Sequence, residues 1–203
     1  MTDSTATARW AALVVAMVAA ASLLLQAYLS MGTQGSVSAA FAFLSQFFTI
    51  LTNLLVCLTM AVAAAGRRTP PVWIGALVVA IAGVGIVYHL VLAKLWNPQG
   101  LQWVADQGLH TAVPVLTSLW WLGFADKTRA RWRDALIAIL WPLVYCVYAL
   151  TRAEFSGFYP YPFLDLTKLS LGELATNIAA LTAGFIVLGL VLVLLARLMR
   201  RTG

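Results

Sequence analysis

Charged residues are scarce in this chain of 203 residues. Only 10% of its residues are Asp, Glu, Lys or Arg, whereas 62% are hydrophobic. A soluble domain carries about 25% charged residues, so this composition excludes an ordinary soluble fold. The net charge of +6 comes from basic residues that flank apolar runs, as the ends of membrane helices do. We therefore expect no nucleic-acid partner.

Cysteine and histidine are also rare. Cys57 and Cys146 both lie within apolar runs, which excludes a framework of disulfides and indicates two small core residues. The only histidines are His89 and His110, and no CxxC, HExxH, GxGxxG or Walker-type motif is present. We therefore expect no metal site and no cofactor. A haem held by the two histidines is a weaker alternative.

What the chain does contain is a series of apolar runs of about 20 residues, each long enough to cross the hydrocarbon core of a bilayer. They predict an all-α integral membrane protein, with residues 1–203 forming one domain of six transmembrane helices. The expected helices cover residues 10–31, 40–65, 72–95, 109–124, 134–150 and 171–199.

The basic residues of the connecting segments are distributed unevenly between the two sides of this arrangement. Ten lie on the side of the termini: Arg9, Arg67, Arg68, Lys127, Arg129, Arg131, Arg133, Arg197, Arg200 and Arg201. Three lie on the other side: Lys94, Arg152 and Lys168. Because loops rich in Lys and Arg stay in the cytoplasm, we expect both termini to be cytoplasmic and the protein to lie in the cell membrane.

The expected helix 40–65 carries a polar stripe within its apolar run. Ser45, Gln46, Thr49, Thr52 and Asn53 fall at helical spacing and share one face. Lipid offers these groups no hydrogen-bond partners, so the face should turn toward other helices or a wet cavity. Packing between helices explains such a stripe without any catalysis.

A histidine at a similar expected depth gives the stripe a chemical interpretation. His110 starts the expected helix 109–124, and an ionisable residue within a span suggests function. A threonine hydroxyl becomes nucleophilic when a base lies within hydrogen-bond reach, and imidazole suits that role. We therefore predict Thr49 as nucleophile and His110 as base. Thr52 is a rival hydroxyl.

The remaining polar residues of the spans are candidates for supporting roles. Amide side chains can hold an oxyanion, and Gln46, Asn53 and Asn177 carry such groups. We expect His89 to line the substrate site or to pack in the core. The carboxylate that orients His110 stays open, and the candidates are Asp106, Asp165 and Glu173.

Three segments of the chain resemble motifs of the androgen-induced family of membrane threonine hydrolases. They are the string from Phe47 to Asn53, the string from Gln107 to Pro114, and the Tyr-Pro segment from Tyr159 to Asp165. The resemblance covers six expected helices in matching order. It implies six spans with cytoplasmic ends, hydrolysis of fatty-acid esters of hydroxy fatty acids without a metal, Thr49 as nucleophile and His110 as base. The chain resembles a compact bacterial relative, to which the animal substrate need not transfer.

Two function classes follow from these observations. The first is an intramembrane hydrolase that cleaves a lipid-type ester, with a membrane lipid or acyl ester as its substrate. The second is a transporter or binding protein for lipids or small molecules, whose polar stripes line a pathway. Catalysis predicts that the Thr49 hydroxyl is essential. Transport predicts a graded loss over several polar residues.

Overall fold

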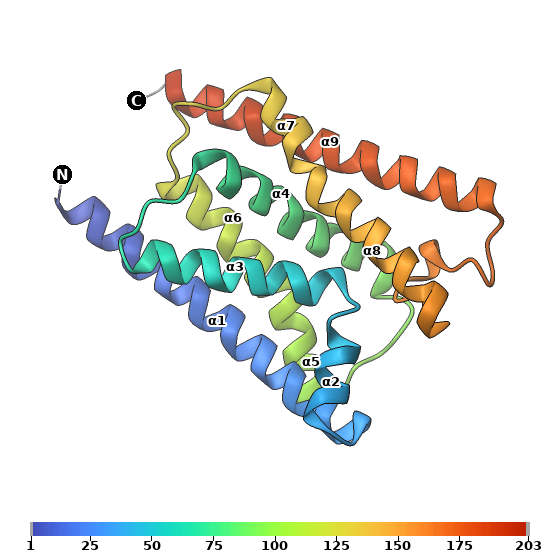
Figure 1. The fold of residues 1–203 in the computed structure, drawn as a ribbon. Coiled ribbons are helices and arrows are strands. Elements are labelled where there is room, and N and C mark those ends of the chain that lie inside the picture. Colours follow the sequence, from blue (N-terminus) through green and yellow to red (C-terminus); the bar gives the residue numbers. More distant parts are fainter. Residues whose placement is uncertain (1, 202–203) are drawn as a thin grey trace.

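The computed structural model describes residues 2–201, and within that range the chain is helical with no β-strand (Figure 1). Two short π-helical turns, η1 and η2, and one 3₁₀ turn, η3, accompany the α-helices. The elements are α1 (Thr2–Gln34), α2 (Val37–Leu44), α3 (Phe48–Ala64), α4 (Pro71–Val87), η1 (Tyr88–Leu92), α5 (Gly100–Gln107), η2 (Gly108–Ala112), α6 (Val113–Phe124), α7 (Trp132–Ala138), α8 (Leu140–Ser156), η3 (Pro162–Leu164) and α9 (Leu171–Arg201).

Four helical runs of the described part of the chain are long and apolar enough to cross a membrane: Thr5–Gln34, Pro71–Leu92, Trp132–Ser156 and Leu171–Arg200. The bent pair of α2 and α3 makes a fifth if it counts as one span. The helical run from 100 to 124, expected as a span from 109 onward, is not among them. It carries Asp106 and His110, and polar residues of this kind lower its hydropathy.

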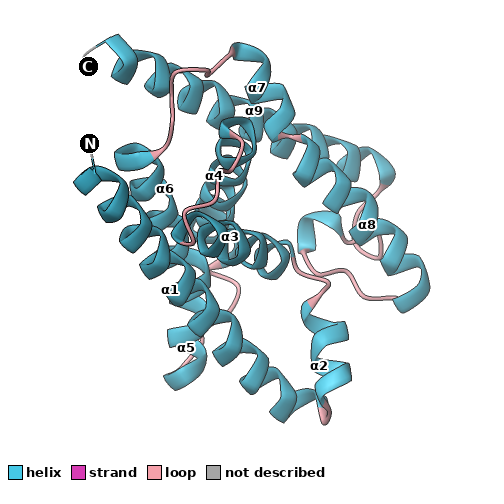
Figure 2. Cartoon of the chain, turned by 60° about the vertical axis from the view of Figure 1, so that its left-hand side comes forward, coloured by secondary structure: helices cyan, strands magenta, loops and turns pink. Residues whose placement is uncertain are grey.

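The expected single helix over 40–65 is wrong, because the chain breaks between α2 and α3 with a bend of 97° (Figure 2). At the end of α2 the side chains of Ser45 and Gln46 donate back to carbonyls of that helix, at 2.9 Å and 3.3 Å. Phe47 is extended and precedes the first turn of α3. Ser45 and Gln46 therefore do not continue the stripe of Thr49.

Side chains of α8 hold this break in place. The Tyr145 hydroxyl donates to the Gln46 carbonyl at 2.6 Å, and the Tyr148 hydroxyl donates to the Ser45 carbonyl at 3.0 Å. Arg152 donates to the carbonyl of Ala42 at 2.9 Å. Backbone carbonyls that leave a helix inside a bilayer need such partners. The break is thus a tertiary feature that the local sequence does not reveal.

The expected start of a helix at residue 109 is also wrong. The segment 96–108, expected as a loop, contains α5, and α5, η2 and α6 form one continuous helical run. Gly108 lies within it because α1 packs closely there: a Cβ atom at Gly108 would lie 2.1 Å from the hydroxyl of Ser22. This glycine therefore permits close helix packing and does not mark a loop.

The expected helix 134–150 is observed as α7 and α8, which are interrupted at Ile139 and extend to Ser156. Pro142 lacks a backbone N–H, which explains the interruption one turn before it. Gly157, with φ of 66°, ends α8 in the left-handed conformation that glycine adopts without strain. The expected ranges 10–31, 72–95 and 171–199 overlap α1, the α4–η1 run and α9.

The helices pack so that most basic residues gather at one end. Figure 1 shows both termini and the loops before α4 and before α7 at the same end of the bundle. Arg9 donates to the carbonyl of Ala64 at 3.0 Å, and Arg200 donates to the carbonyl of Thr128 at 2.6 Å. We call this the basic end. Since α3 ends there and spans 17 residues, Thr49 lies about 22 Å away from it along the helix, at ~1.5 Å per residue.

Candidate active site

Thr49 lies in the first turn of α3, directly after the helix break. The first N–H groups of an α-helix have no acceptor within the helix, and the helix dipole adds positive potential there. A straight helix through 40–65 would have placed Thr49 in its interior, where its N–H is bonded. The break therefore gives Thr49 an environment that favours negative charge.

The Thr49 hydroxyl lies next to the imidazole of His110. Oγ1 of Thr49 and Nε2 of His110 are 3.2 Å apart. Thr49 comes from α3 and His110 from η2, so two helices that are 61 residues apart in sequence supply the pair. This distance is within reach of a hydrogen bond between a nucleophile and its base.

Asp106 orients the other side of the imidazole. Its Oδ1 lies 3.2 Å from Nδ1 of His110, and its backbone carbonyl lies 3.1 Å from the same nitrogen. Both partners are acceptors, so Nδ1 carries the proton and Nε2 is left to accept the hydroxyl of Thr49. Asp106 is 2% exposed. Of the three carboxylates left open by the sequence, this is the one in contact with His110.

Tyr88 completes the shell around the histidine, and the sequence analysis missed it. Its ring stacks on His110 with the centroids 4.1 Å apart and the planes 16° from parallel. Its hydroxyl donates to Oδ2 of Asp106. Tyr88 lies in η1 and His110 in η2, and π-helical turns often occur at functional sites. The two turns bring both side chains to one place.

The other two carboxylates lie elsewhere and have partners of their own. Asp165 accepts a hydrogen bond from the backbone N–H of Thr167 at 3.0 Å and pairs with Lys168 at 3.1 Å. The Thr167 hydroxyl lowers the pKa of Asp165. Glu173 accepts from the hydroxyl of Ser170 at 2.8 Å, before the first turn of α9. Both are parts of turns and helix caps.

Thr52 and Asn53 are fully buried, but neither offers its polar group to a substrate. The Thr52 hydroxyl accepts from the indole N–H of Trp141 at 3.0 Å. The Asn53 amide donates to the carbonyls of Thr49 at 2.8 Å and Leu109 at 3.2 Å, which uses both of its hydrogens. Asn53 thus ties α3 to η2, next to His110, and its amide hydrogens are already bonded to these carbonyls.

Gln46, His89 and Asn177 also lie away from the lining of the cavity at Thr49. Gln46 stays at the helix break, with its Oε1 buried and without a partner. His89 is exposed and bonds to Thr111 at 3.0 Å, because Tyr88 takes the inward position at this turn. Asn177 donates to the carbonyl of Phe163 at 3.1 Å and so holds the Tyr-Pro loop.

Tyr161 of that loop is a further site residue that the sequence analysis did not assign. The backbone N–H of Thr49 lies 3.4 Å from its hydroxyl oxygen. Burial raises the pKa of Tyr161, so the hydroxyl keeps its proton at neutral pH. A phenol can donate that proton to a developing oxyanion beside Thr49. Only the folded loop reveals this, since 112 residues separate the two positions.

Two cavities meet at Thr49. The larger is about 420 Å³ and is lined by Thr49, His110, Asp106 and Tyr161 together with polar residues of α1 and α5, among them Gln26 and Gln102. This volume falls in the usual range for small-molecule sites, about 300–1,000 Å³. The smaller is about 60 Å³ and has a largely apolar lining from α4, α8, α9 and the Tyr-Pro loop. Thr49 therefore faces two cavities with largely apolar linings, and the larger of the two also contains polar side chains.

Within residues 2–201, no three His, Cys, Asp or Glu side chains lie close enough together to hold a metal ion. Both ring nitrogens of His110 have hydrogen-bond partners, so neither is free to bind a haem iron in this conformation.

Comparisons with protein-family models, with curated proteins and with solved structures each found no match to this chain.

Proposed function

We propose that this chain is an intramembrane hydrolase of a lipid-type ester, with Thr49 as nucleophile and His110 as general base. The observation that carries the proposal is the continuous series of contacts from the Thr49 hydroxyl to His110, and from His110 to the carboxylate of Asp106. Hydroxyl, imidazole and carboxylate in this order form the arrangement by which serine hydrolases activate an alcohol. Helix packing alone does not require it.

The proposed reaction has two stages. The hydroxyl of Thr49 attacks the ester carbonyl, and its proton passes to Nε2 of His110. The oxyanion that forms is held by the Tyr161 hydroxyl and by N–H groups of the first turn of α3. When the tetrahedral intermediate collapses, the alcohol leaves with the proton from His110. Water, activated by His110, then cleaves the acyl-threonine and releases the acid.

The two cavities support an amphiphilic substrate. The smaller, apolar cavity suits a hydrocarbon arm of the ester. In the larger cavity Gln102 donates to Gln26 at 2.8 Å, and Gln26 donates to Ser30 at 3.2 Å, so polar groups line the wall beyond His110. The ester bond would lie where the cavities meet, with a second arm that carries hydrogen-bonding groups. The resemblance to the androgen-induced family fits the same substrate class.

The proposal includes the membrane arrangement. We infer six helical runs that cross the bilayer, with α2 and α3 as one broken run and α5, η2 and α6 as another. The basic end faces the cytoplasm, in accordance with the distribution of Lys and Arg. Thr49, His110 and Asp106 then lie in the outer half of the bilayer, where an ester lipid can enter from the side.

The experiment is covalent labelling of purified, detergent-solubilised protein with a fluorophosphonate probe. Thr49→Ala and His110→Ala should abolish labelling, because one removes the nucleophile and the other its base. Thr52→Ala is the matched control: it removes a hydroxyl one turn away that bonds Trp141, so labelling should persist. Thermal unfolding of each variant verifies the fold.

Labelling that survives in Thr49→Ala would contradict the assignment of the nucleophile. A folded wild type that takes no label and hydrolyses none of a panel of acyl esters would favour the transport or binding alternative. In that case flux or binding should fall gradually over variants of Gln26, Gln102 and His110.

A further inference from the structure

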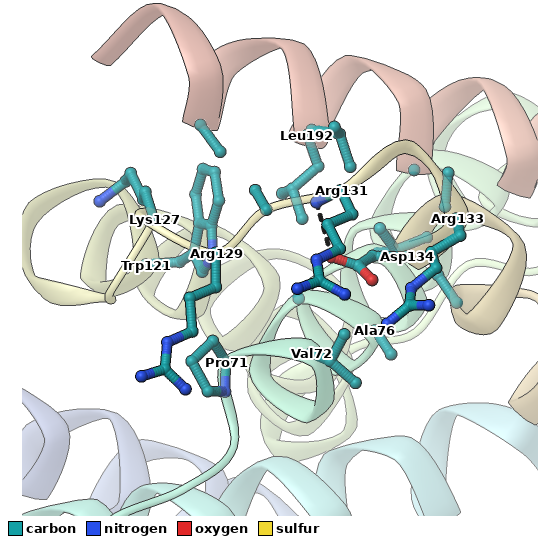
Figure 3. A pocket seen from close by; sticks show the side chains of 18 of the residues that line it. Pro71, Val72, Ala76, Trp121, Lys127, Arg129, Arg131, Arg133, Asp134 and Leu192 are labelled. Atoms are coloured by element: carbon teal, nitrogen blue, oxygen red, sulfur yellow. Dashed lines mark hydrogen bonds between the residues drawn. The ribbon is translucent and has the colours of Figure 1, made fainter. Parts of the chain in front are cut away.

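A third cavity lies at the basic end, far from Thr49, and it has a different chemistry (Figure 3). It is about 210 Å³ and lies between the start of α4, the end of α6, α7 and α9. Its floor is apolar: Val72 and Ala76 come from α4, and Leu192 comes from α9. None of these residues belongs to the site at Thr49.

Three arginines surround the mouth of this cavity. Arg129 and Arg131 lie in the loop before α7, and Arg133 lies in its first turn. Figure 3 shows the three side chains extending toward the beginning of α4, where Pro71 and Val72 lie. All three are exposed. A cluster of guanidinium groups over an apolar floor therefore faces outward at this end of the bundle.

The positive charge of the cluster is only partly offset within the protein, because Asp126 and Asp134 line the same cavity as the three arginines and Lys127. The acidic side chains at the cavity are engaged locally: Asp134 accepts from the backbone N–H of Arg131 at 2.8 Å, and Asp126 accepts from the backbone N–H of Thr128 at 2.8 Å. Among the described residues, no carboxylate lies within ion-pair distance of Arg129, Arg131 or Arg133.

Lys127, by contrast, has a structural role in the same loop. Its ammonium donates to the carbonyls of Leu122 at 2.9 Å and Ala125 at 3.1 Å, and it lies over the ring of Trp121 at 5.0 Å. These contacts cap the end of α6. Within the part of the chain that the structure describes, Arg129 and Arg133 have no ion pair, which leaves their guanidinium groups for a ligand.

We propose that this cavity binds the headgroup of an anionic phospholipid from the cytoplasmic leaflet. Guanidinium groups bind phosphate with paired hydrogen bonds, and the apolar floor suits the first methylenes of the acyl chains. Cytoplasmic leaflets are rich in anionic lipids, and basic pockets between membrane helices bind such headgroups. A soluble phosphate would leave the apolar floor unused. The inference rests on the proposed orientation, with the basic end in the cytoplasm, and not on the proposed hydrolase chemistry.

The test is native mass spectrometry of the full-length protein in detergent, titrated with phosphatidylglycerol or with phosphatidylcholine. Two variants remove the same charge at the same end: Arg129→Gln/Arg133→Gln at the cavity, and Arg67→Gln/Arg68→Gln in the exposed loop before α4, outside the cavity lining. Wild type and the Arg67/Arg68 variant should retain phosphatidylglycerol about tenfold better than phosphatidylcholine. The Arg129/Arg133 variant should lose that preference.

A second experiment tests the apolar floor of the cavity separately from the arginines at its mouth. Ala76→Phe fills the apolar floor and leaves the arginines in place, so it should weaken phosphatidylglycerol binding. Glycerol 3-phosphate, which has no acyl chains, should bind the wild type weakly or not at all. Glycerol 3-phosphate that competes at equal concentration would make this a site for a soluble anion. If both arginine double variants lose the preference for phosphatidylglycerol equally, the preference comes from general surface charge and not from this cavity. Either result overturns the proposal.

Discussion

Asp106 is the residue whose role the fold defines most sharply. The sequence offers three carboxylates near the expected outer side, and nothing in their spacing favours one of them. The structure places Asp106 one helical turn before His110, with Oδ1 on Nδ1 and Oδ2 on the hydroxyl of Tyr88. Each oxygen of the carboxylate therefore has a distinct partner, and together they fix the orientation of the imidazole.

We predict that Asp106→Asn lowers the rate of ester hydrolysis about 10²–10⁴-fold, because an amide no longer stabilises the imidazolium that forms when His110 takes the proton. Steady-state kinetics with a chromogenic acyl ester measures this. Asp165→Asn is the control. The amide oxygen that this change introduces can still accept from the backbone N–H of Thr167, so this variant should be about as active as wild type. Comparable losses in both variants would contradict the role of Asp106.

Tyr88 acts through other residues and is a positioning residue. In Tyr88→Phe the ring can still stack on His110, but Asp106 loses a buried hydrogen-bond donor. We expect the free energy of unfolding to fall by about 1–3 kcal/mol. We expect kcat to fall about tenfold, equivalent to ~1.4 kcal/mol in the barrier, with KM little changed. A rise in KM at constant kcat would instead indicate that Tyr88 contacts the substrate.

At the scale of helices, the sequence predicts the apolar runs and the pairing of Thr49 with His110, which are 3.2 Å apart in the structure. It did not anticipate the break before Thr49, because the break depends on Tyr145 and Tyr148 of a distant helix. A pattern read over neighbouring residues reports local periodicity. It does not report which backbone carbonyls accept hydrogen bonds from side chains of distant helices. Those hydrogen bonds decide where α3 begins.

Packing of α4 against η2 and the start of α6 sets the position of His110. A Cβ atom at Gly85 would lie 3.1 Å from the carbonyl oxygen of His110 and 3.3 Å from Cβ of Pro114. We predict that Gly85→Ala pushes η2 away from α4 and lowers hydrolysis at least tenfold, measured with the same ester. The protein should remain folded, since the displacement is a few tenths of an ångström.

Gly184→Ala is the control for this prediction. Gly184 lies within α9, and a Cβ atom there would meet nothing within 4 Å. Alanine is favoured over glycine in a helix interior by about 1 kcal/mol, so this variant should be active and slightly more stable. If Gly85→Ala keeps full activity, the close approach of α4 does not set the position of His110.

At the scale of the whole molecule, the arrangement predicts which loops share a side of the membrane. We expect cysteines introduced at Thr69 and Thr128, in a background without Cys57 and Cys146, to resist an impermeant thiol reagent added to intact cells. A cysteine at Gln99 should react. The reason is that the loops before α4 and before α7 lie at the basic end, whereas the loop before α5 lies at the opposite end.

Disrupting the cells should make all three positions reactive, which verifies that each cysteine is accessible. Labelling at Thr128 in intact cells, with Thr69 protected, would mean that the run from α5 to α6 does not cross the membrane. This run is not among those that are long and apolar enough to cross a membrane, and it carries Asp106 and His110.

The tyrosines that hold the helix break lie late in the chain, so the proposed reaction centre can assemble only after most of the chain has been made. The Ser45 and Gln46 carbonyls find their partners 103 and 99 residues later in the chain, and Thr49 meets Tyr161 only after 112 residues. While the ribosome is still making the second half, the nascent chain lacks the hydrogen bonds that hold the break before Thr49. We therefore expect a product truncated before Tyr145 to carry out none of the proposed hydrolysis.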